Sequence, residues 1–129
     1  MVEGSFDRVL VDLPCSGTGT LRKNPELKWR LSGEEIRRLC LSSRRILSGV
    51  ASRVMPGGLL VAMTCSLEQD ENEDVIARFL EERPEFEAQP LAGLIPSHLE
   101  TSLVTPALWR VFPEDDHDGF SVHVLRRRE

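Results

Sequence analysis

The stretch Phe6–Gly19, FDRVLVDLPCSGTG, places the strongest constraint on how this chain can fold. It opens as a short apolar run that only Asp12 interrupts, which is typical of a central strand in a parallel sheet covered on both faces. Pro14 then removes a backbone donor, and two glycines allow a tight loop. The loop would present Asp12, Cys15 and Ser16 at the carboxyl end of the strand, where ligands bind in open α/β sheets. The sequence therefore predicts a functional site in this loop.

A long amphipathic helix is predicted after the loop. Ser32 and Glu35 have the spacing of a capping box, in which Ser32 caps the first turn and Glu35 reaches back to it. Apolar residues, Cys40 among them, then recur at helical spacing to about Met55, so Cys40 is expected in the core. The PGG segment at 56–58 is expected to end the helix.

A second apolar run, at 59–63, ends in Thr-Cys-Ser at 64–66 and predicts a second strand. A strand, a helix and a strand with a crossover of this length form a βαβ unit, whose strands are parallel. The carboxyl ends of parallel neighbours lie at one edge of the sheet. We therefore expect Cys65 to lie in the same cleft as Cys15.

The remaining segments are expected to complete the sheet. The patterns predict a helix over 70–82, an irregular stretch over 85–106, and an antiparallel hairpin of strands at 108–112 and 120–125 around an acidic turn. Asp70 and Glu73 have the spacing of a capping box for the helix. The basic residues at 126–128 are expected to form a frayed tail.

Length and composition narrow the possible classes of protein. A chain of 129 residues has room for a single domain with a real core. No apolar run approaches the roughly 20 residues of a membrane span, and the start lacks a signal-peptide pattern, so no membrane partner is expected. Three widely spaced cysteines fit reduced thiols in a cytoplasmic protein better than a disulfide framework or a zinc site, and no metal is expected. A net charge of −5 argues weakly against a stand-alone nucleic-acid binder.

Five short phrases follow one another along the chain: DLPCSGTG at 12–19, NPELKW at 24–29, PGG at 56–58, TCSLEQDENE at 64–73 and DGF at 118–120. In this order they resemble the RNA cytosine-5 methyltransferases of the Sun/Fmu (RsmB-like) group, and the resemblance covers 6–127. The pairing of Asp-x-Pro-Cys-Ser-Gly-x-Gly with Thr-Cys-Ser is the specific part. It implies an α/β, Rossmann-like fold, S-adenosylmethionine as methyl donor, and rRNA or tRNA as substrate.

The resemblance also implies a role for each thiol. In this family a cysteine thiolate adds to carbon 6 of cytosine, after which carbon 5 can attack the methyl group of S-adenosylmethionine. Cys65 is implied as the nucleophile, and Cys15 as the helper in proton removal and enzyme release. Asp12 is implied at the polar edge of the cytosine, and Asp12 and Pro14 beside the cofactor.

Each of these assignments has a structural alternative. A cysteine at a strand end is usually an inert buried side chain, although the presence of both motifs favours catalysis. Asp12 could cap its loop by accepting backbone N–H bonds. Arg22, Lys23 and Lys28 are predicted RNA contacts, with a solvated basic face as an equal alternative. Trp29 could stack on a base, but packing under the loop is the favoured expectation.

The chain departs from the family in two ways. The family's glycine-rich loop, and the acidic residues that bind ribose and adenine, precede the first motif and have no counterpart here. The chain is therefore expected to be the carboxyl half of the catalytic domain, strands four to seven of a seven-stranded sheet. Its first strand would have an unpaired edge, which predicts a homodimer or a requirement for the missing N-terminal half. Ser121 and His123 also depart from the family pattern, at positions expected to face or flank the core.

Two functional alternatives remain beside RNA cytosine-5 methylation. One is a non-catalytic module that binds RNA or a partner and lacks a complete cofactor site. The other is a different methyltransferase chemistry. Amino-group methylation is disfavoured because Cys15 follows the proline, where those enzymes have proline again. A DNA-type mechanism would exchange the roles of Cys15 and Cys65.

Overall fold

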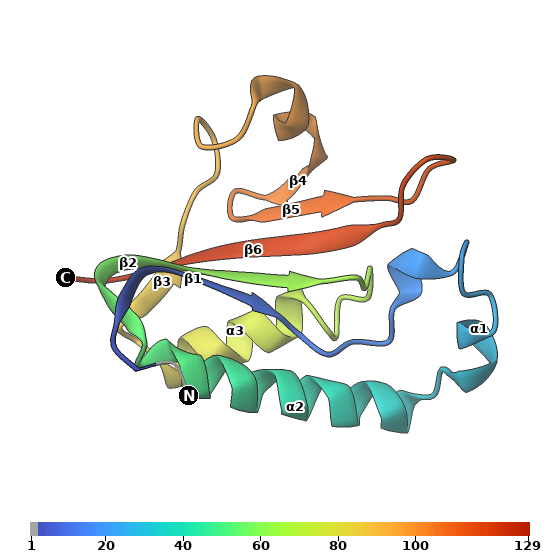
Figure 1. The fold of residues 1–129 in the computed structure, drawn as a ribbon, viewed down its shortest axis with the longest axis horizontal. Helices are drawn as coiled ribbons and strands as arrows, with labels where there is room; N and C mark the ends of the chain where they lie inside the picture. The colour runs from blue at the N-terminus through green and yellow to red at the C-terminus, as the bar shows by residue number, and fades with distance from the viewer. Residues whose placement is uncertain (1–2) are drawn as a thin grey trace.

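The computed structural model describes residues 3–129, and it has a mixed α/β fold (Figure 1). The elements in chain order are β1 (Phe6–Asp12), the 3-10 helix η1 (Thr18–Thr20), α1 (Leu27–Arg30), α2 (Gly33–Ala51), β2 (Val54–Thr64), α3 (Glu73–Glu82), β3 (Phe86–Ala88), the 3-10 helix η2 (Ser97–Ser102), β4 (Leu103–Thr105), β5 (Leu108–Val111) and β6 (Phe120–Arg127). None of the helices in the described residues is long and apolar enough to cross a membrane.

One sheet contains every strand of the described residues, in the order β1-β2-β6-β5-β4, with β3 also paired to β6. β1 and β2 are parallel, with Asp12 opposite Met63, and the predicted βαβ unit is confirmed. β5 and β6 form the predicted antiparallel hairpin, with Val111 opposite Phe120. The expected irregularity of 85–106 is wrong in part, because β3 and β4 lie in this segment and join the sheet.

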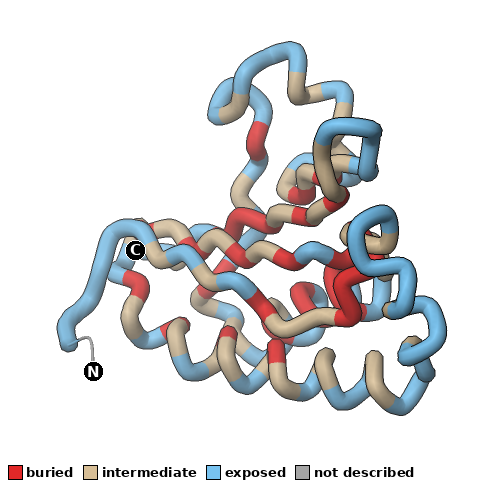
Figure 2. The backbone as a smooth tube through the Cα atoms, turned by 45° about the vertical axis from the view of Figure 1, so that its right-hand side comes forward, coloured by how far each residue is buried: buried red, intermediate tan, exposed pale blue. Residues whose placement is uncertain are grey.

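Helices cover one face of the strands that carry the site. α2 and α3 lie side by side beneath β1 and β2 (Figure 1), and the buried residues gather between these layers (Figure 2). The core contains Leu47, Leu60, Phe79 and Leu125, which come from both helices and from two strands. On β2, even-numbered residues from Gly58 onward are buried and odd-numbered ones are half-buried, as expected when only one face packs on a core.

β1 is not a central strand covered on both faces, so that expectation is wrong. It is the terminal strand of the sheet order, and Leu10 is 69% exposed. Val9 and Val11 pack against the helix-covered core, whereas Leu10 and Asp12 face the open side. The apolar run resembled a doubly covered strand because both its faces carry aliphatic residues.

The end of α2 also differs from the prediction. α2 ends at Ala51, and the PGG segment at 56–58 lies within β2. Fully buried Val54 pairs with Phe6, whereas the next pair is Arg8 with Leu59, so β2 carries an irregular insertion between these pairs. Gly57, with φ of 76°, allows that detour.

The predicted helix caps are confirmed only in part. The Ser32 hydroxyl accepts from the Glu35 backbone N–H at 3.1 Å, but the Glu35 carboxylate pairs with Arg38 instead of reaching back. α3 begins at Glu73 rather than near residue 70, so the expected Asp70–Glu73 box does not form.

The basic residues at the end of the chain are not a frayed tail. β6 extends to Arg127, whose guanidinium donates to the Val54 carbonyl at 2.6 Å. Arg126 donates to the Gln89 side-chain oxygen at 2.7 Å. The end of the chain is therefore held to β2 and to the segment after β3.

Candidate functional site

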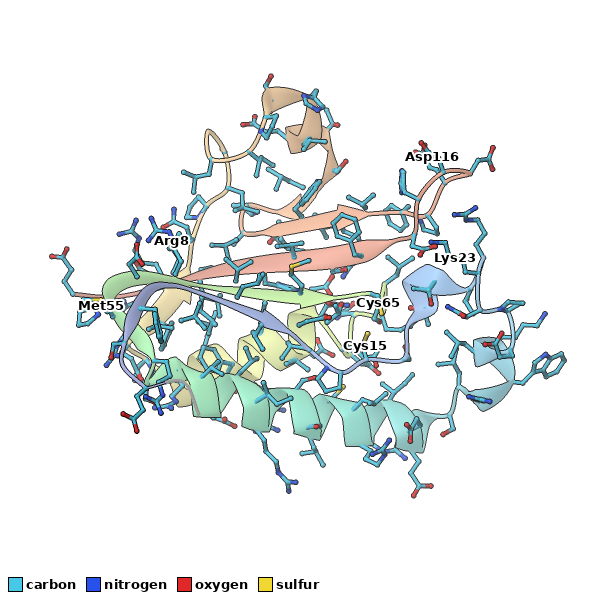
Figure 3. All side chains as sticks on the ribbon, in the orientation of Figure 1. Arg8, Cys15, Lys23, Met55, Cys65 and Asp116 are labelled. Atoms are coloured by element: carbon cyan, nitrogen blue, oxygen red, sulfur yellow. The ribbon has the colours of Figure 1, made fainter. Side chains whose placement is uncertain are left out.

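Two thiols meet where β1 and β2 end. The Sγ atoms of Cys15 and Cys65 are 3.2 Å apart, although 50 residues separate them in sequence (Figure 3). The backbone N–H of Leu13 donates to the Met63 carbonyl at 2.8 Å, so the two strands stay paired up to the point where their loops begin. The predicted convergence of the two cysteines is confirmed.

The contact makes the two thiols chemically different. The hydrogen bond from Cys15 lowers the pKa of Cys65 to about 7, against the opposing effect of partial burial. The same bond, together with burial, raises the pKa of Cys15. Cys65 is exposed and Cys15 is half-buried. The pair therefore provides a thiolate at Cys65 near neutral pH and a thiol at Cys15.

A buried carboxylate joins the two cysteine loops. Glu71 accepts from the backbone N–H of Ser16 at 2.7 Å and from its hydroxyl at 2.6 Å. It also accepts from the hydroxyl of Ser66. Ser16 follows Cys15 and Ser66 follows Cys65, so each cysteine has a neighbour bound to this carboxylate.

The loop after Cys65 is held by the start of α3. Asn72 accepts from the Thr64 hydroxyl at 2.7 Å and donates to the carbonyls of Ser66 and Glu68 at 3.1 and 2.8 Å. The Ser121 hydroxyl donates to the same Ser66 carbonyl at 2.9 Å. These bonds fix the direction in which the chain leaves β2.

Ser121 in turn belongs to an ion-pair network. Buried Arg110 donates to the Ser121 hydroxyl at 2.9 Å and makes two bonds with Glu73, at 3.0 and 2.8 Å. Burial alone would raise the pKa of Glu73, but the bonds from Arg110 lower it overall. The network connects β5, β6 and α3 behind the cysteine loops.

Three loops approach one another through backbone contacts alone. The N–H of Gly19 donates to the Cys65 carbonyl, and the N–H of Gly119 donates to the Gly19 carbonyl, both at 2.8 Å. A Cβ atom on Gly19 would lie 2.2 Å from the Gly119 oxygen and 2.8 Å from the Cys65 oxygen. Glycine is therefore required at position 19 for steric reasons.

The thiol pair lies between two cavities. The larger, of about 480 Å³, is on the open face of the sheet and is lined by Leu10, Asp12, Met63, Thr64, Cys65 and Phe120. The smaller, of about 210 Å³, is lined by Cys15 and Ser16 together with residues of α1 and α2. Each thiol therefore borders a different cavity.

Asp12 and Pro14 occupy different environments. Asp12 is exposed and lines the larger cavity beside Cys65, and none of the described residues forms a hydrogen bond with its carboxylate within the structure. Pro14 is half-buried, and its carbonyl accepts from Ser43 at 3.0 Å on the side of α2. Of Asp12 and Pro14, only Asp12 lines the cavity that Cys65 also borders.

The other candidate residues lie outside the thiol pair. Cys40 is half-buried against the core, and its thiol donates to the Asp70 carbonyl at 3.2 Å. Arg22 donates to the Asp115 carbonyl at 2.7 Å, and Lys23 pairs with Asp118 at 3.0 Å. Both basic residues thus contact the acidic turn.

Trp29 does not pack under the loop, so that expectation is wrong. Its side chain is 82% exposed, because α1 is a single turn that projects from the body of the molecule (Figure 1). The ammonium of Lys28 lies 5.2 Å from the Trp29 ring centroid. Lys28 and Trp29 therefore form a small exposed cationic and aromatic surface.

The sequence did not reveal the roles of Glu71 and Asn72. Both lie in the phrase TCSLEQDENE, but a run of acidic and amide residues before an amphipathic segment is typical of a helix start. The available signal was their position seven and eight residues after the end of β2, in a segment that must return over the strand ends. Their burial depends on tertiary contacts, which the pattern does not encode.

The chain is similar to known proteins along almost its whole length. The profile of the family described as "16S rRNA methyltransferase RsmB/F" matches residues 1–126. A probable ribosomal RNA small subunit methyltransferase B from Synechocystis sp. is 38% identical over 122 residues, covering 94% of this chain and 27% of the relative. The ribosomal RNA small subunit methyltransferase B of Thermus thermophilus is also 38% identical, over 93% of this chain and 29% of the relative. The chain thus spans somewhat more than a quarter of these relatives.

Solved structures agree with the sequence comparison. The crystal structure of PH0851 superposes with a TM-score of 0.81 at 36% identity, covering 94% of this chain and 26% of that one. NSun6 from Pyrococcus horikoshii, solved with SFG, has a TM-score of 0.75 at 23% identity and covers 99% of this chain and 32% of that one, which supports the fold alone. Taken with the family profile, these matches establish that the chain belongs to the RsmB/F family of 16S rRNA methyltransferases.

Proposed function

We propose that this chain carries the catalytic thiols of an enzyme that methylates carbon 5 of cytosine in RNA through a covalent cysteine adduct. The observation that carries the proposal is the 3.2 Å contact between Cys15 and Cys65 at the carboxyl ends of two parallel strands. A lone structural cysteine needs no second thiol at hydrogen-bond distance. Covalent catalysis with a separate release step uses two thiols, one for each step.

The proposed reaction begins at Cys65. Its thiolate forms a bond to carbon 6 of an unstacked cytosine, and the electrons of the carbon 5–carbon 6 double bond shift toward the ring nitrogen, which takes up a proton. S-adenosylmethionine, when bound, supplies the methyl group that carbon 5 takes up. Once the sulfur of Cys65 is bonded to carbon 6 it is no longer a thiolate that accepts the Cys15 proton, so Cys15 can lose this proton to water and, as thiolate, remove the carbon 5 proton. The electrons of that bond re-form the carbon 5–carbon 6 double bond, the sulfur of Cys65 leaves as thiolate, and the ring nitrogen gives its proton back to water.

The larger cavity is the proposed place of the reacting groups. Asp12 lies at its rim beside Cys65, where a carboxyl group can bind the polar edge of cytosine or the cationic part of the methyl donor. Pro14 stays a weaker candidate for cofactor contact, because it lies on the α2 side of the loop. Arg22, Lys23 and Lys28 are proposed as RNA contacts of secondary importance, since two of them are engaged with the acidic turn.

The proposal for the whole molecule is wider than the catalytic pair. We propose that the chain corresponds to the carboxyl half of the catalytic domain, that it acts in the cytoplasm on rRNA or tRNA, and that the free edge of β1 binds either a second copy or the N-terminal half. A complete cofactor site would then include residues from that other segment.

The test is a trapped covalent complex with RNA. The chain and its Cys65→Ala and Cys15→Ala variants are incubated with S-adenosylmethionine and a cytosine-containing rRNA fragment, then separated on a denaturing gel. We expect Cys15→Ala to accumulate a slow-migrating adduct, because release is impaired, and Cys65→Ala to form none. Cys40→Ala serves as the matched control and should behave like the unaltered chain.

Other outcomes identify the alternatives. An adduct in Cys65→Ala that is lost in Cys15→Ala would assign the nucleophile to Cys15. No adduct with any variant, combined with no heat of S-adenosylmethionine binding in a calorimetric titration, would favour the non-catalytic module.

A further inference from the structure

Glu71 is a buried carboxylate to which the proposed chemistry gives no role. Its side chain is 2% exposed, in the segment between β2 and α3. Removing a carboxylate from water is strongly unfavourable unless hydrogen-bond donors replace the water. Here three donors do so: the N–H and hydroxyl of Ser16 and the hydroxyl of Ser66. All of them come from the two cysteine loops.

The position of these donors links Glu71 to the thiols. Ser16 and Ser66 are the residues directly after Cys15 and Cys65, so the carboxylate fixes the distance between the backbones that carry the two sulfur atoms. No covalent bond joins these loops. The thiol contact of 3.2 Å therefore depends on how these two backbones are held.

We propose that Glu71 is a positioning residue that holds the Cys15 and Cys65 loops at the separation at which the two thiols meet. This inference deepens the proposed function and rests on it for its meaning in catalysis. Its physical content concerns only the reactivity of Cys65, which is measurable without RNA or methyl donor.

The charge of Glu71 and the loop separation that it fixes change the pKa of Cys65 in opposite directions, which makes the proposal testable. The negative charge of Glu71 raises the pKa of both Cys65 and Cys40. Removing the charge alone would therefore lower the pKa of both thiols. Releasing the loops would instead remove the hydrogen bond from Cys15 and raise the pKa of Cys65 only.

The experiment measures the pH dependence of iodoacetamide alkylation at each cysteine by mass spectrometry. The chain is compared with Glu71→Ala, Glu71→Gln, Ser16→Ala and Cys15→Ala, and with Asp74→Ala as a control that removes an exposed carboxylate near the start of α3. In Glu71→Ala we expect the midpoint for Cys65 to rise by about one to two pH units, as in Cys15→Ala. Ser16→Ala should give a smaller rise, and Asp74→Ala none.

Glu71→Gln provides the rescue. Its amide keeps the shape and one acceptor, and its NH2 group can donate to a hydroxyl. We expect its Cys65 midpoint to be at or below that of the unaltered chain, because the loops stay in place and the charge is gone. A folded Glu71→Ala variant whose Cys65 midpoint stays or falls would overturn the proposal.

Loss of the fold gives a different signature. In an unfolded variant Cys40 would react as fast as Cys65, whereas in a folded one half-buried Cys40 stays slow. If Glu71→Ala unfolds, the Ser16→Ala variant provides the test. An unchanged midpoint for Cys65 alkylation in Ser16→Ala would overturn the positioning role of Glu71. Because this readout uses neither RNA nor S-adenosylmethionine, it can fail while the covalent-adduct test succeeds, or the reverse.

Discussion

At the scale of single residues, the reactivity of Cys65 depends on one neighbouring side chain. The hydrogen bond from Cys15 is the largest influence on its pKa, and the carboxylates of Asp12 and Glu71 oppose it. A thiol with a pKa near 7 is about half ionised at neutral pH, whereas an ordinary thiol is a few per cent ionised. The proposed nucleophile is therefore activated by the residue that is also proposed for the release step.

Replacing Cys15 by alanine should make Cys65 an ordinary thiol. The pKa of Cys65 should rise from about 7 toward 9.0, the value without the contact. We expect its alkylation by iodoacetamide at pH 7 to slow by about tenfold or more. Following alkylation by mass spectrometry against pH tests this, with Cys40→Ala as the control. An unchanged midpoint in Cys15→Ala would contradict the assigned hydrogen bond.

His123 is the second residue whose environment has a measurable consequence. It is 5% exposed, and burial lowers its pKa to about 4, with Glu73 opposing and Arg110 reinforcing the shift. Between pH 6.5 and 4 the unfolded chain binds a proton that the folded chain does not, so stability falls as the pH falls. The loss over this range should be about 3 kcal/mol.

The change His123→Leu should remove that loss. The free energy of unfolding in urea is measured at pH 7 and at pH 4 for both proteins. Its decrease between these pH values should be smaller in the variant than in the unaltered chain, by about 3 kcal/mol. His98→Leu, which alters an exposed histidine, is the matched control and should keep the original pH dependence. If the free energy of unfolding changed equally between pH 7 and pH 4 in all three proteins, His123 would be accessible to protons in the folded state.

At the scale of elements, the contact of Gly19 with Gly119 holds the first loop against the acidic turn. We expect Gly19→Ala to destabilise the fold by about 3 kcal/mol, since a Cβ would collide with two carbonyl oxygens that cannot both retreat. Gly49→Ala is the contrasting variant. Nothing lies within 4 Å of a Cβ at this position in α2, so the change should stabilise by about 1 kcal/mol.

Urea unfolding of the two glycine variants measures both effects. Changes of opposite sign in the free energy of unfolding would confirm that a steric clash determines the effect of alanine at position 19 and that helix propensity determines it at position 49. If Gly19→Ala were as stable as the unaltered chain, the approach of the three loops would have to be looser than the structure has it.

The strands and helices that position the thiols could be predicted from sequence because each has a local signal. The apolar runs at β1 and β2 and the helical spacing between them led to the βαβ unit, and hence to Cys15 and Cys65 at one edge. The parallel pairing of these strands brings the two residues to that edge. The antiparallel hairpin of β5 and β6 was likewise visible as two apolar segments around an acidic turn.

The features that could not be predicted all depend on what lies across space. Val54 and the PGG segment joined β2 rather than α2 because Phe6 supplies a pairing partner. Glu71 is buried because Ser16, which is 55 residues away in sequence, and Ser66 donate to it, and Trp29 is exposed on the single helical turn α1. Local propensity carries no information about such partners.

At the scale of the whole molecule, β1 leaves one edge of the sheet without a partner among the described residues. Leu10, on its open face, is 69% exposed. Such an edge pairs readily with another strand. We expect light scattering to show association that increases with concentration, and Leu10→Lys to reduce it, because a charge on the strand opposes pairing.

Leu94→Lys is the matched control for this prediction. It makes the same chemical change at a side chain of similar exposure, 61%, that lies outside the strands. Association should persist in this variant. A clean monomer at high concentration in the unaltered chain would contradict a second copy at the β1 edge.

The backbone bonds between Gly19, Cys65 and Gly119 also bear on how the molecule folds. They join segments on the order of 50 to 100 residues apart, so the entropy of closing long loops must be overcome before any of them can form. The amides of Gly19 and Gly119, which donate in these bonds, should therefore exchange with deuterium only when the whole sheet opens. The two thiols would then become neighbours at the last stage of folding, and a newly made chain would acquire its reactive cysteine only once its architecture is complete.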